Sequence, residues 1–140
     1  MFASAMQQLR SFFRPQSLGE RGEIAAARYL KRKGYILVAR SARDKTGELD
    51  IVAVYQRVVV FVEVKTRTSH DAGHPAEAVD AEKQRRLTNL ALRYLKRHDL
   101  LEQRWRFDVV AVTWPKNNRR PTIEHYVAAF EPVGGGQMFH

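Results

Sequence analysis

The spacing of apolar side chains predicts two helices in this chain. Residues 18–33 repeat apolar residues at roughly helical intervals and end in "KRKG", which places cations on the last turn and Gly34 just after it, as is typical of a helix C-terminus. Residues 81–99 are the clearest helix, with Asp80 as the expected N-cap. Its apolar stripe consists of Leu87, Leu90, Ala91, Tyr94 and Leu95.

Between and after these helices, the apolar residues follow strand-like patterns. "YILVAR" at 35–40, "GELDIVAV" at 47–54 and "VVVFVEVKT" at 58–66 predict strands. The last two should pair as an antiparallel hairpin, because only "YQR" separates them. "WRFDVVAVTW" at 105–114 predicts another strand, whereas "TIEHYVAAF" at 122–130 is either a final strand or a mixed segment. This order predicts an α/β fold, a single domain with a central mixed β-sheet flanked by helices.

The chain length and the composition of the ends suggest how the protein is organised. Its 140 residues suit one domain, which we expect at 18–132, after an N-terminal arm at 1–17 and before a flexible tail at 133–140. No stretch approaches the ~20 apolar residues that span a bilayer, and the N-terminus lacks the apolar core of a signal peptide. The chain has no cysteine, which excludes disulfides and thiolate metal sites. We therefore expect a cytoplasmic protein without a membrane partner.

The charge balance narrows the class of partner. The chain has 24 Lys and Arg against 15 Asp and Glu, a formal net charge of +9. Such an excess favours a polyanionic partner, most simply nucleic acid, because bound cations neutralise phosphates and release counterions. A basic surface without such a partner is equally consistent with the composition.

The most apolar strand ends in charged residues on a face that should be covered. Side chains alternate along a strand, so Glu63 and Lys65 share a face with Val59 and Phe61, and both faces are apolar up to that point. Charges there would be costly unless they had partners, a metal or a cleft at the end of the sheet. In the expected hairpin Asp50 comes near the same end. Two carboxylates and an ammonium then converge on one small volume.

This arrangement suggests a particular chemistry. Two carboxylates suit Mg²⁺ or Mn²⁺, which retain waters for a substrate phosphate. A metal held in this way lowers the pKa of a bound water and stabilises charge on a phosphoryl group, and Lys65 would orient the water or stabilise the charge. The combination points to phosphodiester hydrolysis. From spacing alone, an ion-pair network at the sheet edge is equally consistent.

Five sequence blocks, in this order, resemble a family of nucleases. "GELDIVA" followed by "VFVEVKTR" is similar to the D…E-x-K core of the PD-(D/E)-x-K nucleases, which have the restriction-endonuclease-like fold. With "LGERGEIAAARYLKRKGY", "GHPAEAVDAEKQRRL" and "RFDVVAV…IEHYVAAF", the chain resembles the small bacterial YraN-like family, itself similar to archaeal Holliday-junction resolvases. The resemblance covers nearly all of residues 18–131. The proline that opens the nuclease motif is not kept, since Leu49 precedes Asp50 here.

The resemblance implies roles for individual residues. Asp50 and Glu63 would be metal ligands, with the Val64 carbonyl as a third, and Lys65 would be the catalytic lysine. The cofactor would be Mg²⁺ or Mn²⁺.

Three more polar residues are candidates for the site. Glu23 matches the acid that completes such sites in resolvase-like members and would be a further metal ligand, although on its own it is typical of a solvated helix residue. Gln84 lies in the "KQRR" block that borders the active site in many relatives. Glu48 is either an outer acid of the site or a hydrogen-bond acceptor for the "DKTG" turn, and we favour the turn.

Basic residues around the predicted acids should hold phosphates and counter the repulsion between the acids and a nucleic acid. These residues are Arg40, Arg43, Lys45, Arg67, Lys83, Arg85 and Arg86. For those on the second helix, a solvated face is the alternative.

Asp108 and the histidines have structural explanations. Asp108 is either an acid facing the site from another strand or the partner of a nearby arginine, and we favour the partner role. His70, His74 and His125 lack tight ligand spacing, so we expect loop histidines without a functional role.

The leading hypothesis is a metal-dependent DNA endonuclease that acts on branched or damaged DNA. A junction-cleaving enzyme makes two cuts related by symmetry, so a homodimer would suit it. One alternative is a nucleic-acid-binding module with a slow or inert site that acts with recombination or repair partners. A scaffold protein with a basic surface is the third.

Overall fold

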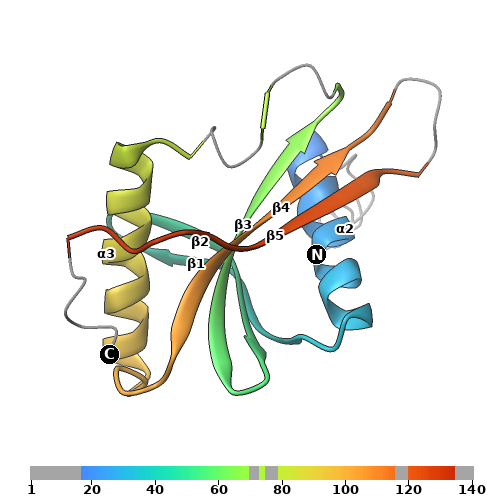
Figure 1. Cartoon of the computed structure of the whole chain (residues 1–140). Helices are drawn as coiled ribbons and strands as arrows, with labels where there is room; N and C mark the ends of the chain where they lie inside the picture. Colours follow the sequence, from blue (N-terminus) through green and yellow to red (C-terminus); the bar gives the residue numbers. More distant parts are fainter. Residues whose placement is uncertain (1–16, 70–72, 75–78, 116–119, 135–140) are drawn as a thin grey trace, which may run out of the picture.

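Two helices cover opposite faces of one five-stranded sheet in the computed structural model of the protein, which describes residues 17–69, 73–74, 79–115 and 120–134 (Figure 1). The helices are α2 (Leu18–Arg32) and α3 (Ala81–Arg97). The strands, adjacent in chain order, are β1 (Ile36–Asp44), β2 (Gly47–Tyr55), β3 (Val58–Arg67), β4 (Trp105–Thr113) and β5 (Thr122–Phe130). Only β3 and β4 pair in parallel, so the sheet is mixed. The predicted α/β architecture is confirmed, and it is consistent with a restriction-endonuclease-like domain.

Both helices begin and end as their sequences predict. The Ser17 hydroxyl accepts the Glu20 N–H, and the Asp80 carboxylate accepts the Lys83 N–H, which satisfies donors that the first turn of a helix leaves free. Gly34 follows α2 with a φ of 94°, a conformation that costs glycine little. The arm predicted at 1–17 and the tail at 133–140 lie outside the described residues, apart from residues 17, 133 and 134.

A two-residue turn forms the predicted hairpin between β2 and β3. Tyr55 pairs with Val58, so that Gln56 and Arg57 make the turn with φ values of 49° and 67°. Positive φ at both central residues is typical of the type I′ turn, whose twist matches that of paired strands. The segment 122–130, for which two alternatives remained, is a strand.

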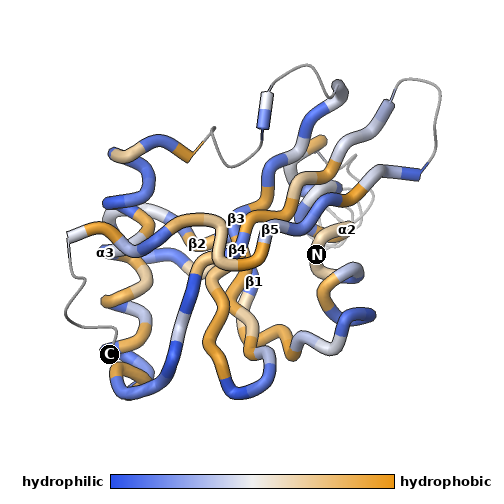
Figure 2. Tube along the Cα trace, viewed as in Figure 1, coloured by the Kyte–Doolittle hydropathy of each residue, from blue (hydrophilic) through white to orange (hydrophobic). Residues whose placement is uncertain are grey.

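The two faces of β3 are buried against different helices, as its alternation predicts. Val59 and Phe61 belong to the apolar cluster beneath α3, whereas Val60 and Val62 belong to the cluster beneath α2. Figure 2 shows apolar residues concentrated in the middle of the sheet, with polar residues toward the strand ends. A strand covered on both sides keeps Glu63 and the residues beyond it close to the two helices.

Gly22 allows α2 to approach the end of β3 closely. A Cβ atom at Gly22 would lie 1.8 Å from the Thr66 Oγ1 atom, closer than any non-bonded contact. This contact fixes where along β3 the helix packs, and with it the position of Glu23, the next residue of the helix. Within the described part of the chain, no helix is long and apolar enough to cross a membrane.

Candidate metal centre

Asp50 lies where β2 and β3 separate. Their antiparallel pairing runs from Tyr55 and Val58 to Ile51 and Val62 and goes no further. Beyond it, the Asp50 Oδ2 atom accepts the backbone N–H of Val64 at 2.9 Å. The carboxylate thus replaces a main-chain acceptor, which accounts for an acid in mid-strand. Burial and the nearby charge of Glu63 raise the pKa of Asp50 to about 7.

Three acids from two elements meet at this point and form what we call the acid cluster: Glu23 on α2, with Glu48 and Asp50 on β2. One carboxylate oxygen from each lies within 4.8 Å of the others. Glu23 also accepts a hydrogen bond from the Ser41 hydroxyl at 3.4 Å. Burial raises the pKa of Glu23, and the charge of Arg40 partly offsets this effect.

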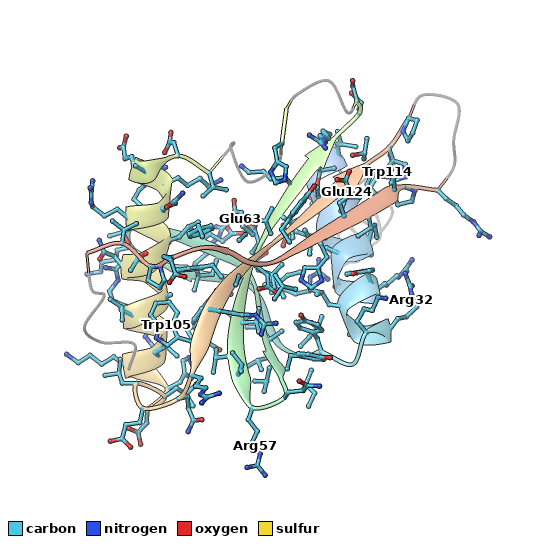
Figure 3. The ribbon with its side chains drawn as sticks, in the orientation of Figure 1. Arg32, Arg57, Glu63, Trp105, Trp114 and Glu124 are labelled. Carbon is cyan, nitrogen blue, oxygen red and sulfur yellow. The ribbon has the colours of Figure 1, made fainter. Side chains whose placement is uncertain are left out.

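Glu63 is buried beside the acid cluster but is bound to lysines. Its Oε1 atom lies 2.5 Å from Lys83 Nζ and 3.8 Å from Lys65 Nζ. Figure 3 shows Glu63 near the centre of the sheet, on the side toward α3. Glu63 therefore faces an ammonium from α3 as well as the lysine of its own strand.

The two lysines differ in how the site affects them. Burial and the neighbouring Lys83 ammonium lower the pKa of Lys65. For Lys83, burial acts in the same direction, but the hydrogen bond to Glu63 outweighs it and the pKa is raised. Lys83 is therefore a firmly charged partner of Glu63, whereas Lys65 loses its proton more easily.

The acid cluster has a donor set that suits a hard divalent cation. All of its donors are carboxylate oxygens, the ligands that Mg²⁺ and Mn²⁺ prefer. Oxygens on opposite sides of a bound Mg²⁺ are about 4.2 Å apart, twice the ligand distance. The observed 4.8 Å therefore needs only a small contraction to close around an ion. Glu63 would join the ligands only after leaving Lys83.

Comparison with known proteins places the chain in a family. The sequence model of the uncharacterised protein family UPF0102 matches residues 22–112. A UPF0102 protein of Rhodopirellula baltica is 54% identical over 120 residues, which cover 84% of this chain and 72% of the relative. This chain belongs to the UPF0102 family. UPF0102 proteins of Chlorobium limicola (42% identical, covering 83% and 93% of the two chains) and Chloroflexus aurantiacus (48%, covering 80% and 91%) are also similar. UPF0102 is the YraN-like family that the motifs resemble.

In this UPF0102 protein, Gln84 bonds to the main chain that precedes α3, and its role at the site stays a prediction. Its side-chain amide donates to the Val79 carbonyl at 2.8 Å, at the start of α3. The residue that α3 directs into the site is its neighbour, Lys83. Val64 is held at the site through its N–H, and the role of its carbonyl stays a prediction.

The predicted phosphate-binding residues fall into two groups. Arg40, Lys45, Arg85 and Arg86 have exposed side chains. The others have partners within the protein. Arg43 pairs with Glu48 at 2.7 Å but remains 78% exposed, and Lys83 is bound to Glu63.

Arg67 also has partners within the protein. Its side chain is only 15% exposed, donates to Thr113 Oγ1 and to the Gly73 carbonyl, and pairs with Glu124. These contacts join the end of β3 to β4, to β5 and to Gly73. Its charge is therefore directed into the protein, and phosphate binding by Arg67 would break these contacts.

Glu48 has a different partner from the predicted one. We expected it to accept from the "DKTG" turn, but it accepts from Arg43 and its carboxylate joins the acid cluster. In the sequence, the only indication that Glu48 belongs to the site was its position two residues before Asp50, which suggests the same strand face. The approach of α2, which brings Glu23 to the same point, could not be read from that spacing.

Asp108 has the structural role that we favoured. It is fully buried, accepts from Arg106 Nε at 2.9 Å and from the Ala128 N–H at 3.0 Å, and lies 2.8 Å from His125 Nε2. These hydrogen bonds outweigh the effect of burial and lower the pKa of Asp108. His125 lies in β5, so the expectation that it is a loop residue without a role was wrong. His70 lies outside the described residues, and the His74 ring packs against Tyr126.

Proposed function

We propose that this UPF0102 protein is a metal-dependent DNA endonuclease that hydrolyses phosphodiester bonds. The observation that carries the proposal is the position of Asp50. It lies within 4.8 Å of two other carboxylates, at the point where β2 separates from β3, and next to the strand that carries Glu63 and Lys65. In an ion-pair network each acid would have its own cation. Here Glu48 pairs with Arg43, but Glu23 and Asp50 accept hydrogen bonds from neutral donors and lie close to a third carboxylate.

The residues of the site would divide the work between them. Glu23, Glu48 and Asp50 would hold Mg²⁺ or Mn²⁺, with Glu63 as a further ligand once it leaves Lys83. When bound, such an ion supplies a water of lowered pKa and stabilises charge on a phosphoryl group. Lys65, whose pKa is lowered by burial and by Lys83, would donate hydrogen bonds to a phosphate oxygen. Closely packed acids repel DNA, so cations must offset them.

DNA is the substrate that the charges favour. The formal net charge is +9, and exposed basic side chains at Arg40, Lys45, Arg85 and Arg86 flank the acids on β1, the turn that follows it and α3. Branched or damaged DNA is the form that the resolvase-like motifs favour, and a homodimer would supply two symmetric cuts. Bacterial DNA lies in the cytoplasm, where the proposal places the protein.

One observation favours the alternative, a nucleic-acid-binding module with an inert site that acts with recombination or repair partners. The Glu63 carboxylate is already neutralised by Lys83. If that pair persists when DNA binds, Lys83 occupies Oε1 of Glu63 and opposes metal binding at that oxygen.

The test is cleavage of end-labelled single-stranded, duplex, flap and four-way-junction DNA with Mg²⁺ or Mn²⁺, using the wild type and the Asp50→Asn and Lys65→Ala variants. We expect metal-dependent cutting that is lost in both variants. Arg28→Ala, an exposed residue of α2, is the control and should cut normally. DNA binding without cutting, equal in wild type and variants, would establish the binding module instead.

A further inference from the structure

A cavity of about 160 Å³ lies between the end of β1 and the second half of α3. It has roughly ten times the space that a single water needs. Its floor is apolar and buried, formed by Leu49, Leu90 and Tyr94. Its rim carries two arginines, Arg43 and Arg97, beside the His98 ring and the Asp44 carboxylate, whose charge is paired with Arg93. With Ala42, these eight lining residues form what we call the rim pocket.

The floor of the rim pocket suits a flat ligand with apolar faces. The Tyr94 and His98 rings lie 4.2 Å apart at 34°, so an aromatic pair forms one wall. Leu49 and Leu90 complete the apolar surface. A nucleobase has two apolar faces and polar edges, and it stacks on aromatic side chains whatever its sequence.

The rim suits the phosphates that flank a base. Arg43 is 78% exposed at its side chain, and Arg97 is exposed as well. One guanidinium group can donate two parallel hydrogen bonds to a phosphate, and it can also stack on an aromatic ring. An apolar floor with a cationic rim matches single-stranded nucleic acid, in which bases and phosphates alternate.

The two walls of the rim pocket are fixed to one another. The Arg93 guanidinium, on α3, pairs with Asp44 at 2.6 Å and donates to the Thr46 hydroxyl. These bonds join the β1–β2 turn to the helix. The pocket therefore exists without a ligand, which lowers the entropic cost of binding one.

The rim pocket adjoins the acid cluster through two of its residues. Arg43 Nε, on its rim, lies 2.7 Å from Glu48 Oε2, and Leu49, in its floor, is covalently joined to Asp50. We expect a DNA strand with one phosphate at the acid cluster to pass the mouth of the pocket.

We propose that the rim pocket binds one unpaired nucleobase of the strand whose phosphate lies at the acid cluster. This inference rests on the proposed function and defines its substrate class as DNA with unpaired nucleotides beside the cut. Bases of an intact duplex are stacked and paired, and entry would require one of them to flip out. Single strands, flaps and branch points present such a base without that cost.

The test compares two single-stranded oligomers of equal length and equal phosphate number, one of thymidines and one of abasic residues. Fluorescence anisotropy in EDTA measures their affinity for the protein without cleavage. We expect the wild type to bind the thymidine oligomer about tenfold more tightly, the low end of what stacking of one or two bases provides. Ala42→Phe, which fills the pocket, and His98→Ala, which removes half of the ring pair, should each lose this preference and keep their affinity for the abasic oligomer.

Val38→Phe is the matched control, because it adds the same ring at an exposed position of the same strand. It should keep the full preference. The proposal is overturned if the wild type shows no preference, or if both pocket variants keep it. Should Ala42→Phe fail to fold by circular dichroism, His98→Ala decides alone. Metal-dependent cutting without any base preference would overturn the proposal that the rim pocket binds a base, but not the proposed nuclease activity. Absence of all DNA binding would overturn both proposals.

Discussion

Lys83 Nζ lies 2.5 Å from Glu63 Oε1, closer than the lysine of the E-x-K motif itself, whose Nζ is 3.8 Å from the same oxygen. An ammonium from α3 therefore neutralises the carboxylate that the motif assigns to a metal. Lysine and metal cannot both take the same oxygen, so they compete for Glu63.

Replacing Lys83 by Met should strengthen metal binding. The variant frees Glu63, and the affinity for Mn²⁺, measured by isothermal titration calorimetry, should rise about fivefold, the equivalent of ~1 kcal/mol for a partly exposed ion pair. Arg86→Met removes the same charge from an exposed position one turn further along α3 and is the control. Equal gains in the two variants would show that only overall charge matters.

Gly22→Ala should loosen the packing of α2. The new Cβ would lie 1.8 Å from Thr66 Oγ1 and 2.8 Å from Thr66 Cβ, so the helix must move. We expect the free energy of unfolding in urea to fall by about 1–3 kcal/mol and Mn²⁺ affinity to fall with it, since Glu23 moves too. Gly19→Ala meets no atom closer than 4.0 Å and should be neutral or stabilise by up to ~1 kcal/mol. A stable Gly22→Ala protein would contradict the close approach.

Asp50 should make stability depend on pH. Its pKa of about 7 in the folded protein is above its ordinary value of 3.8, so the native state holds the proton more tightly. This contribution to stability is complete below about pH 4 and is lost as the pH rises through 7. In EDTA at pH 8, Asp50→Asn should be more stable than the wild type by about 2 kcal/mol, roughly half of what the shift corresponds to, because solvent reaches part of the site.

The difference between Asp50→Asn and the wild type should disappear by pH 4, as denaturation curves at the two pH values would show. Asn can still accept the Val64 N–H, so the comparison isolates the charge. Equal stability at pH 8 would mean that Asp50 is ionised in the native state without cost.

Exposed and internally bonded arginines should affect DNA binding differently. Replacing Arg85 and Arg86 by Ala should reduce the slope of log affinity against log salt by about 0.7–0.9 for each phosphate that the variant no longer neutralises. Arg67→Ala should leave the slope nearly unchanged and instead lower the melting temperature, because Arg67 bonds to Thr113 and to the Gly73 carbonyl. Titrations at several salt concentrations, with melting curves alongside, separate the two effects. An unchanged slope in the double variant would contradict the phosphate role of these arginines.

Alternation along the strands was enough to predict much of the site. Val59, Phe61, Glu63 and Lys65 are consecutive on one side of β3, so two buried apolar residues followed by two charges indicate a covered polar site from the order of residues alone. Asp50 followed from the hairpin, because a short turn fixes which strand ends meet. These predictions depend only on local geometry.

The parts that could not be predicted depend on contacts between distant elements. Glu23 meets Glu48 and Asp50 because α2 approaches β3 over Gly22, and Lys83 reaches Glu63 because α3 packs with its first turn at the site. Neither helix position is encoded by periodicity, which predicts the buried face of a helix but not where along the sheet it packs. Lys83 shows the same limit, since neighbouring residues on a helix differ in direction by about 100° and only the packing of α3 decides which of them meets Glu63.

The Asp50 carboxylate has two roles. It would bind a catalytic ion, and its Oδ2 atom accepts the Val64 N–H where the main-chain pairing of β2 and β3 has ended. Truncating Asp50 therefore confuses two effects, a lost ion and a loosened strand pair, and an inactive alanine variant cannot tell them apart. Because the side chain must accept the Val64 N–H, few residues can replace Asp50 without loss of stability, even in a protein that no longer cuts DNA. An acid at this position is consequently weaker proof of catalysis than an acid at Glu23 or Glu48, whose hydrogen bonds within the described part of the chain come from the side chains of Ser41 and Arg43.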